Sequence, residues 1–319
     1  MAVRATRVAA MKTSVHWPYT RSGARLQVLR CSPWMRRGSR RHAIVLWHGL
    51  GLSSLCFHFC PDGRRSVVEY LVSDGWEVWT PSMRGAGQSD RTSGLGFADA
   101  LDDAQDVVEY VAKTTKQRVH WVGHSLGAMM LCAALARSEC ARNIRSGVLV
   151  AGSIYLEQSS LLQRLLPLWR WMPHTGMVPS GWIKSRFVRW LTHGALFATA
   201  PAHTPPSVRR DFLKQCVQPL PLRMVDDLST GLRSGGMVDP SSGCPLGGAL
   251  ARSRCPLLLI AGEADRVMPV GTMRELFENT SASRLVVAPH LGHVDVITGE
   301  SAAQTVWAEV AVHCARYDY

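Results

Sequence analysis

The chain has 319 residues, which is enough for one large domain with an insertion or for two modest domains. Hydrophobic residues make up 46% of the sequence and charged residues 19%, a balance that excludes disordered and fibrous proteins. The formal net charge is +12, but the first sixty residues contain no Asp or Glu, so the charge is local and we expect no nucleic-acid partner.

The first part of the chain is where the positive charge is concentrated. Residues 1–13 are basic, free of acidic residues and weakly apolar, which is compatible with an organelle transit segment but not with a secretory signal. A second basic run, from Arg36 to Arg41, precedes an apolar strand and is expected to form a solvated turn. No segment approaches the roughly 18 consecutive apolar residues of a membrane-spanning helix. We expect a cytoplasmic or organellar protein, with contact to a membrane surface left open.

Short apolar runs indicate the strands. Residues 14–32 predict a hairpin around Ser22 and Gly23, which would add an antiparallel edge to a sheet. Six further runs rich in Val, Ile and Trp predict strands. These six runs are AIVLWHG (43–49), WEVWTPS (76–82), RVHWVGH (118–124), SGVLVAG (146–152), PLLLIAG (256–262) and RLVVAPH (284–290).

Helical patterns alternate with these strands. Residues 64–75, 97–116 and 301–317 carry apolar side chains at steps of three and four, which predicts amphipathic helices. In the second of them Asp99, Asp102 and Asp103 crowd the first turns, where the positive end of the helix dipole favours acidic residues. The alternation predicts an α/β fold with a mostly parallel, doubly wound sheet.

One stretch interrupts the alternation. Residues 154–254 contain no convincing strand but many turn residues, several prolines and short amphipathic pieces, which predicts an insertion of short helices. The expected organisation is therefore a basic extension over 1–13, a core formed by 14–153 and 255–319, and a helical insertion over 154–254.

The strongest local motif is GHSLG at residues 123–127, placed between a predicted strand and an Ala-rich helical run. This pattern is typical of a nucleophile elbow, in which Ser125 occupies a turn so tight that Gly123 and Gly127 must lack side chains. A serine hydroxyl is a weak nucleophile at neutral pH, so Ser125 requires a base and a group that orients the base.

Candidates for those two groups follow the last two predicted strands. Asp265 comes after 256–262 and His293 after 284–290, so both belong to the sheet edge where the loops at the carboxyl ends of the strands converge. Two other carboxylates compete with Asp265. Glu263 is interpreted as a strand-end residue and Asp295 as a cap for the helical turn after His293.

A tetrahedral intermediate would also need two backbone donors for its oxyanion. One candidate is the amide of Leu126, directly after Ser125, and the other is the amide of Leu50. Leu50 lies in the turn His48-Gly49-Leu50-Gly51, which follows the first buried strand. Inside the two motifs, His48 and His124 are interpreted as structural supports.

The nine cysteines are scattered from Cys31 to Cys314 without the paired spacing of a zinc site. The closest pair, Cys56 and Cys60, is not followed by a second pair of ligands at metal spacing. We expect buried free thiols in a reducing compartment and no metal at the site.

With these motifs in order, the sequence resembles the α/β-hydrolase superfamily and, within it, the lipase and esterase branch. The resemblance is carried by HGLG, MRGAGQSD (83–90), GHSLG, AGEADRVMP and LGHVDVITG, and it covers most of the chain from about residue 14. It implies the α/β-hydrolase fold, with residues 154–254 in the usual position of a lid. It also implies ester or thioester hydrolysis without a metal or organic cofactor.

The expected reaction is cleavage of a small-molecule carboxylic ester through an acyl-enzyme. An apolar acyl group is expected because the insertion is rich in large apolar residues, although packing within the insertion explains the same residues. An acyltransferase using the same three groups and a ligand-binding or signalling member of the fold remain alternatives. The large apolar residues are Leu161, Leu162, Leu165, Leu166, Trp169, Trp171, Trp182 and Trp190.

Overall fold

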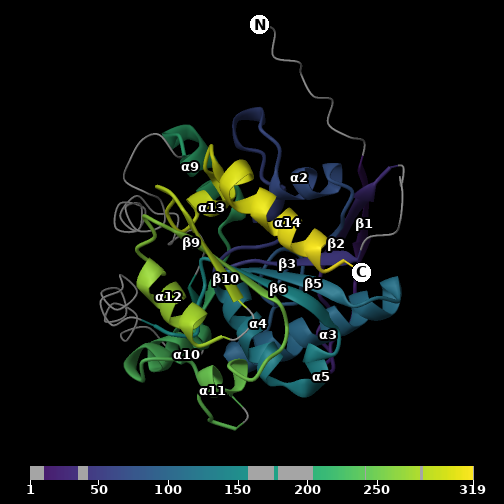
Figure 1. The fold of residues 1–319 in the computed structure, drawn as a ribbon. Coiled ribbons are helices and arrows are strands. Elements are labelled where there is room, and N and C mark those ends of the chain that lie inside the picture. Colours follow the sequence, from purple (N-terminus) through teal and green to yellow (C-terminus); the bar gives the residue numbers. More distant parts are fainter. Residues whose placement is uncertain are drawn as a thin grey trace, which may run out of the picture.

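A computed structural model describes residues 11–34, 42–156, 176–178, 204–240, 242–280 and 283–318. Its centre is an eight-stranded sheet in the order β1-β2-β4-β3-β5-β6-β9-β10 (Figure 1). Each of the six predicted strands is present, and the last of them, β10, lies at an edge of the sheet. The strands are β1 (Met11–His16), β2 (Val28–Pro33), β3 (Ala43–Trp47), β4 (Glu77–Pro81), β5 (Val119–His124), β6 (Ile144–Val150), β9 (Leu257–Gly262) and β10 (Ser283–Ala288).

The sheet is mostly parallel with an antiparallel edge. β1 and β2 form the predicted hairpin, and β2 pairs antiparallel with β4, whereas all pairs from β4 to β10 are parallel. The core begins earlier than the predicted residue 14, because residues 11–13 already pair with Pro33, Ser32 and Cys31. The predicted extension over 1–13 is therefore wrong for residues 11–13, and residues 1–10 lie outside the described residues.

Helices cover both faces of the sheet, as the doubly wound prediction requires. The helices α2 (Val67–Ser73) and α14 (Ala308–Arg316) lie on one face, and α3 (Phe97–Thr115) and α4 (Leu126–Ala136) lie on the other (Figure 1). Two groups of buried apolar side chains, one for each face, form the core. The remaining helices of the core are α1 (Leu55–His58), η1 (Pro61–Gly63), α5 (Ser138–Ala141), α12 (Val270–Glu278), α13 (Asp295–Thr298) and η2 (Ala303–Trp307).

Burial and local polar contacts explain several of these elements. Every residue of β3, β5 and β9 is buried, which accounts for their continuous apolar sequences. At the start of α2, the Ser66 side chain and the Glu69 side chain cap each other's backbone amides. Asp103 of α3 has a further role beyond the helix dipole, because it is buried and paired with Arg84 of the MRGAGQSD motif.

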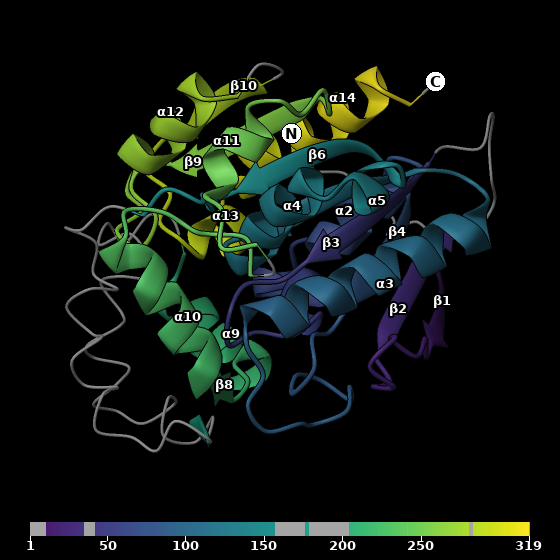
Figure 2. The same ribbon diagram turned by 90° about the horizontal axis from the view of Figure 1, so that it is seen from below.

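The described part of the insertion contains α9 (Pro206–Cys216), α10 (Leu222–Arg233) and α11 (Leu246–Leu250). Figure 2 shows α9, α10 and β8 gathered at one end of the molecule. The expectation of no strand here is wrong, because β7 (Met177–Val178) pairs antiparallel with β8 (Leu220–Pro221). Strands of two residues are too short to produce an alternating pattern, so the sequence gives no sign of them.

Some predictions concern residues outside the described ranges. These are the basic run from Arg36 to Arg41 and all of the large apolar residues that suggested a pocket wall: Leu161, Leu162, Leu165, Leu166, Trp169, Trp171, Trp182 and Trp190. Among the described helices, none combines the length and apolar character needed to cross a bilayer.

The strand order defines where a site can form. From β3 the chain moves outward to β4 in one direction and then returns to place β5 on the opposite side of β3. In open α/β sheets, ligands bind at the carboxyl ends of the strands where the order reverses in this way. The residues after β3 and β5 include Leu50 and Ser125, so both belong to this switch point.

Candidate active site

Ser125 occupies a strained turn between β5 and α4. Its φ of 54° and ψ of −116° lie in a region that L-residues rarely adopt, and its amide donates to the Val150 carbonyl at 2.9 Å. A Cβ at Gly123 would lie 2.2 Å from the Gly127 carbonyl carbon, and a Cβ at Gly127 would lie 2.3 Å from the Trp47 carbonyl oxygen. The two glycines of GHSLG are therefore required by close backbone contacts on both sides of Ser125.

His293 lies between Ser125 and Asp265. Its Nε2 is 3.0 Å from the Ser125 Oγ, and its Nδ1 is 2.8 Å from the Asp265 Oδ2. A carboxylate can only accept, so Nδ1 carries the proton and Nε2 presents its lone pair to the serine hydroxyl. The structure thus brings together the three residues that the sequence identified, in the order of hydrogen bonds that a serine nucleophile requires.

The Asp265 carboxylate is fixed by the backbone of its own loop. Its Oδ1 accepts hydrogen bonds from the amides of Val267 and Met268, both at 2.8 Å. The side chain is fully buried, and that of His293 is 6% exposed. With Oδ1 occupied, Oδ2 is left to hold the imidazole in a single orientation.

The loops that carry Asp265 and His293 pack tightly against each other. The Ala264 amide donates to the Leu291 carbonyl at 3.0 Å. A Cβ at Gly262 would lie 2.4 Å from the same carbonyl oxygen, so the last residue of β9 must be glycine for the loops to meet. Sequence reasoning did not single out Gly262, although its position at the end of a strand just before Asp265 was a usable signal.

The two motif histidines act as buried supports. The His48 Nε2 accepts from the Met83 amide at 3.1 Å, so its Nδ1–H donates to the Gly49 carbonyl at 2.9 Å. The His124 Nε2–H donates to the His293 carbonyl at 2.9 Å. Burial lowers the pKa of His48 to about 4, and burial together with the His293 ring lowers the pKa of His124 to about 3. Both rings are therefore neutral near pH 7, and His124 directly supports the backbone of His293.

The HGLG turn lies directly against Ser125. A Cβ at Gly49 would be 3.1 Å from the Ser125 Cβ, and Gly51 adopts a φ of +70°. Leu126 is the first residue of α4, so no carbonyl of that helix accepts from its amide. The Leu50 turn and the Leu126 amide thus flank the Ser125 side chain from two elements.

The competing carboxylates have other partners. Glu263 is exposed, and its Oε2 accepts from the His290 amide at 2.8 Å, as its interpretation as a strand-end residue suggested. The interpretation of Asp295 as a helix cap is wrong, because Asp295 is buried and is the first residue of α13, whose N-cap position is Val294. Its Oδ2 accepts from the Gly292 amide at 2.9 Å and its Oδ1 from the Thr204 hydroxyl at 2.5 Å. In the described part of the chain, the His293 ring hydrogen-bonds instead to Asp265 and Ser125.

Comparison with known proteins identifies the family. A model of the alpha/beta hydrolase family matches residues 44–309, which is most of the chain. The chain belongs to this family. The predicted fold and the predicted resemblance are both confirmed.

The hydrolase is similar to several known proteins. Triacylglycerol lipase 1 of Arabidopsis thaliana is 24% identical over 136 residues, which cover 39% of this chain and 34% of that lipase. A thermophilic esterase from Thermogutta terrifontis has a TM-score of 0.66 at 15% identity, covering 96% of this chain and 100% of that one. A hydrolase from Pseudomonas aeruginosa PA01 has a TM-score of 0.66 at 18% identity, and the match covers 94% of this chain and 97% of that one. At such identities the structural matches show a shared fold.

Residues of the insertion reach the candidate site of the hydrolase. The Gln218 amide donates to the Gly51 carbonyl at 2.8 Å, and a Cβ at Gly51 would lie 2.6 Å from the Leu220 Cδ2. Thr204 contacts Asp295 as described above. The insertion therefore touches both the turn beside Ser125 and the loop that carries His293, two contacts that no sequence motif signalled.

The hydrogen-bonded side chains at the candidate site are those of Ser125, His293 and Asp265. Among the described residues, the group of His, Cys, Asp or Glu side chains that could hold a metal ion is His42, His120 and Asp318. These residues lie at the amino-terminal ends of β3 and β5 and after α14, away from Ser125.

Proposed function

We propose that this hydrolase cleaves carboxylic esters, with thioesters as the alternative substrate class, through an acyl-enzyme on Ser125. His293 is the general base and Asp265 the residue that orients it. The observation that carries the proposal is the continuous hydrogen-bond chain from Asp265 through His293 to the Ser125 hydroxyl, with separations of 2.8 and 3.0 Å. The strained backbone of Ser125 supports the same role.

In the first half-reaction, the Ser125 Oγ attacks the ester carbonyl carbon and its proton passes to the His293 Nε2. The imidazolium is stabilised by Asp265 through the Nδ1–H bond. The negative charge on the carbonyl oxygen is proposed to be met by the amides of Leu50 and Leu126. Collapse of the intermediate transfers the Nε2 proton to the leaving alcohol and leaves the acyl group on Ser125.

In the second half-reaction, water takes the place of the alcohol. Nε2 removes a proton from the water as it attacks the acyl carbon, and returns that proton to the Ser125 Oγ when the acid is released. The same acyl-enzyme would serve an alcohol or thiol acceptor. Hydrolysis is the reaction that the family and the esterases and lipase among the similar proteins support.

An apolar acyl group is proposed from the composition of the insertion, which is rich in Trp and Leu between residues 161 and 190. Contacts of the insertion with Gly51 support a role for it in admitting substrate. Organic cofactors and metals play no part in this proposed mechanism.

The proposal is tested with a fluorophosphonate probe and with p-nitrophenyl esters. We expect the wild-type protein to be labelled once and to prefer an eight-carbon to a two-carbon ester in kcat/KM. Ser125→Ala is expected to lose all labelling and at least about 10³-fold in kcat, because the nucleophile is removed while binding is retained. A melting curve checks that the variant is folded. Equal labelling of wild type and variant would rule out Ser125, and equal kcat/KM for the two esters would rule out the apolar preference.

A further inference from the structure

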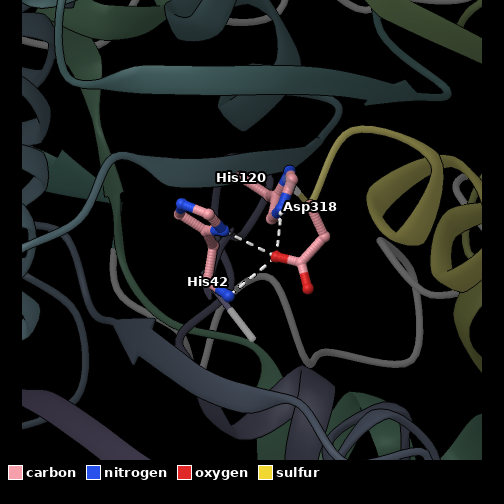
Figure 3. A group of neighbouring side chains, drawn as sticks. All are labelled: His42, His120 and Asp318. Atoms are coloured by element: carbon pink, nitrogen blue, oxygen red, sulfur yellow. Dashed lines mark hydrogen bonds and ion pairs between the residues drawn. The ribbon is translucent and has the colours of Figure 1, made fainter. Parts of the chain in front are cut away.

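Three residues that are far apart in the sequence meet at the sheet edge opposite Ser125. His42 directly precedes β3, His120 is the second residue of β5, and Asp318 follows α14 (Figure 3). Ser125 follows His120 by five positions along β5, which at about 3.3 Å per residue is roughly 16 Å. This cluster, which we call the tail cluster, is therefore separate from the proposed reaction centre.

The side chains of the tail cluster converge on one carboxylate oxygen. The Asp318 Oδ1 is 2.7 Å from the His42 Nδ1 and 3.5 Å from the His120 Nε2, and it also accepts from the His42 amide at 2.8 Å. Figure 3 shows both rings turned toward this oxygen. The potential ligand atoms of the three residues all lie within 4.8 Å of one another.

His120 provides the observation that a purely hydrogen-bonded cluster leaves unexplained. The residue is fully buried, and its Nε2 has no hydrogen-bond partner among the described residues, despite facing Asp318 at 3.5 Å. Its Nδ1 is 2.8 Å from the Ser146 Oγ. When Nδ1–H donates to Ser146, Nε2 carries no proton and its lone pair faces the Asp318 carboxylate oxygen. The two acceptors then have no hydrogen atom or cation between them. Two facing acceptors are an arrangement that a cation would satisfy.

The donor set of the tail cluster suits a divalent metal ion. Two imidazole nitrogens and a carboxylate oxygen are ligands that zinc and related divalent metals prefer.

We propose that His42, His120 and Asp318 bind a divalent transition metal of the zinc type, through the His42 Nδ1, the His120 Nε2 and an Asp318 oxygen. Water would supply the fourth ligand of a tetrahedral site. Ser146 orients the His120 ring from behind, as partners of metal-bound histidines commonly do. Binding through the His42 Nδ1 requires the proton of that nitrogen to move to Nε2, so that the ring stays a neutral imidazole.

The structure can reach this geometry through a small movement. Zinc–nitrogen and zinc–oxygen bonds of about 2.0–2.2 Å place tetrahedral ligand atoms about 3.4 Å apart, so the widest separation in the cluster must contract by roughly 1.4 Å. Asp318 follows α14, and the carbonyl of its neighbour Tyr317 accepts from the Arg145 Nε at 2.7 Å. A bound metal would therefore join the segment after α14 to the amino-terminal ends of β3 and β5.

The experiment measures binding of Zn²⁺ by equilibrium dialysis and of Co²⁺ by its visible absorption, which is intense in tetrahedral sites. Cys60 and Cys244 are exposed thiols that could bind either metal, so the parent protein carries Cys60→Ser and Cys244→Ser. We expect one Zn²⁺ per chain, a tetrahedral Co²⁺ spectrum and a rise in Tm with Zn²⁺ but not with Mg²⁺. His42→Gln and Asp318→Asn in this parent should each weaken Zn²⁺ binding by at least tenfold.

His290→Gln is the matched control, because His290 is an exposed histidine beside Glu263 on another part of the surface. It should bind Zn²⁺ as the parent does, and melting curves without metal verify that every variant is folded. Ester hydrolysis should be the same in all of these proteins, so this outcome is independent of the proposed reaction. The proposal is overturned if the parent binds no Zn²⁺, or if His42→Gln and Asp318→Asn bind it as tightly as the parent.

Discussion

Two buried aspartates flank His293, and their hydrogen bonds distinguish what each can do. Asp265 contacts the imidazole itself, whereas Asp295 accepts from the amide of Gly292, one residue before His293. Removing the charge of Asp265 would leave Nδ1 without an acceptor that fixes the tautomer and stabilises the imidazolium. Removing the charge of Asp295 would leave a neutral acceptor in the same place, and the His293 backbone would keep its bond from His124.

We therefore expect Asp265→Asn to lower kcat by about 10³- to 10⁴-fold, as the loss of an orienting carboxylate does in serine hydrolases. Asp295→Asn should lower kcat by less than about tenfold, because the energy of one weakened hydrogen bond is about 1 kcal/mol. The comparison uses kcat on a two-carbon p-nitrophenyl ester, with fluorophosphonate labelling of both variants. A greater loss with Asp295→Asn would assign the orienting role to Asp295.

Among individual residues, the sequence predicted those whose chemistry is tied to a short motif. Ser125, His293 and Asp265 were identified from GHSLG and from the loops after two strands, and the structure brings them together. The role of Thr204 could not be predicted from the sequence. Its contact with Asp295 joins residues 91 positions apart and depends on how the insertion folds back.

The elbow is also a packing contact between two elements. α4 begins directly after Ser125, and Gly127 brings its first turn against the end of β3, with the position of a Cβ only 2.3 Å from the Trp47 carbonyl oxygen. A backbone carbonyl in a central strand cannot move without shifting its neighbours. The glycine is thus required by the approach of a helix to a strand.

Gly127→Ala is predicted to lower the free energy of unfolding by at least about 1–3 kcal/mol, the usual cost of overpacking, and to abolish labelling of Ser125. Gly248→Ala is the matched control, since Gly248 is an exposed helical glycine of α11 with nothing within 4 Å of an added Cβ. That change should raise the free energy of unfolding by up to about 1 kcal/mol, because alanine favours helix more than glycine does. Urea denaturation measures the free energy of unfolding of both variants. An unchanged free energy of unfolding in Gly127→Ala would show that the close contact is relieved.

The insertion is joined to the His293 loop by a buried hydrogen bond. The Thr204 hydroxyl donates to Asp295 at 2.5 Å, and Thr204 also lies 3.1 Å from the Thr298 hydroxyl. The Arg209 guanidinium of α9 donates to the Thr204 carbonyl at 2.6 Å. The start of α9 is therefore connected through Thr204 to the residues that position His293.

Replacing Thr204 by Val keeps the shape of the side chain and removes the donor. We expect a loss of about 1–3 kcal/mol in unfolding free energy, because Asp295 loses one of its donors in a buried site. If the link positions His293, kcat should also fall several-fold at an unchanged KM. Thr230→Val is the control, since Thr230 is exposed on α10 and donates only within its own helix. A Thr204→Val variant with lower Tm and unchanged kcat would limit the link to stability.

Across the whole molecule, burial keeps several histidines uncharged in the folded state. Burial lowers the pKa of His48, His58 and His313 to about 4, and that of His124 to about 3, whereas an unfolded histidine titrates near 6.5. Between pH 6.5 and about 4 the unfolded chain therefore binds more protons at these positions than the native protein. Asp103 acts in the opposite direction, because burial raises its pKa to about 6 despite the Arg84 partner.

The combined effect of these histidines and Asp103 predicts that the folded protein loses stability in acid. The stabilisation by neutral histidines is fully present above pH 6.5 and decreases toward pH 4, by about 1.4 kcal/mol per pH unit for each group, so four groups outweigh Asp103. Urea denaturation at pH 7.5 and pH 5 should show the lower unfolding free energy at pH 5. His58→Gln, which can keep the bond to the Thr80 hydroxyl, should reduce the difference in unfolding free energy between the two pH values, because one fewer histidine gains a proton on unfolding. An unfolding free energy that is equal at the two pH values would show that burial does not keep these rings neutral.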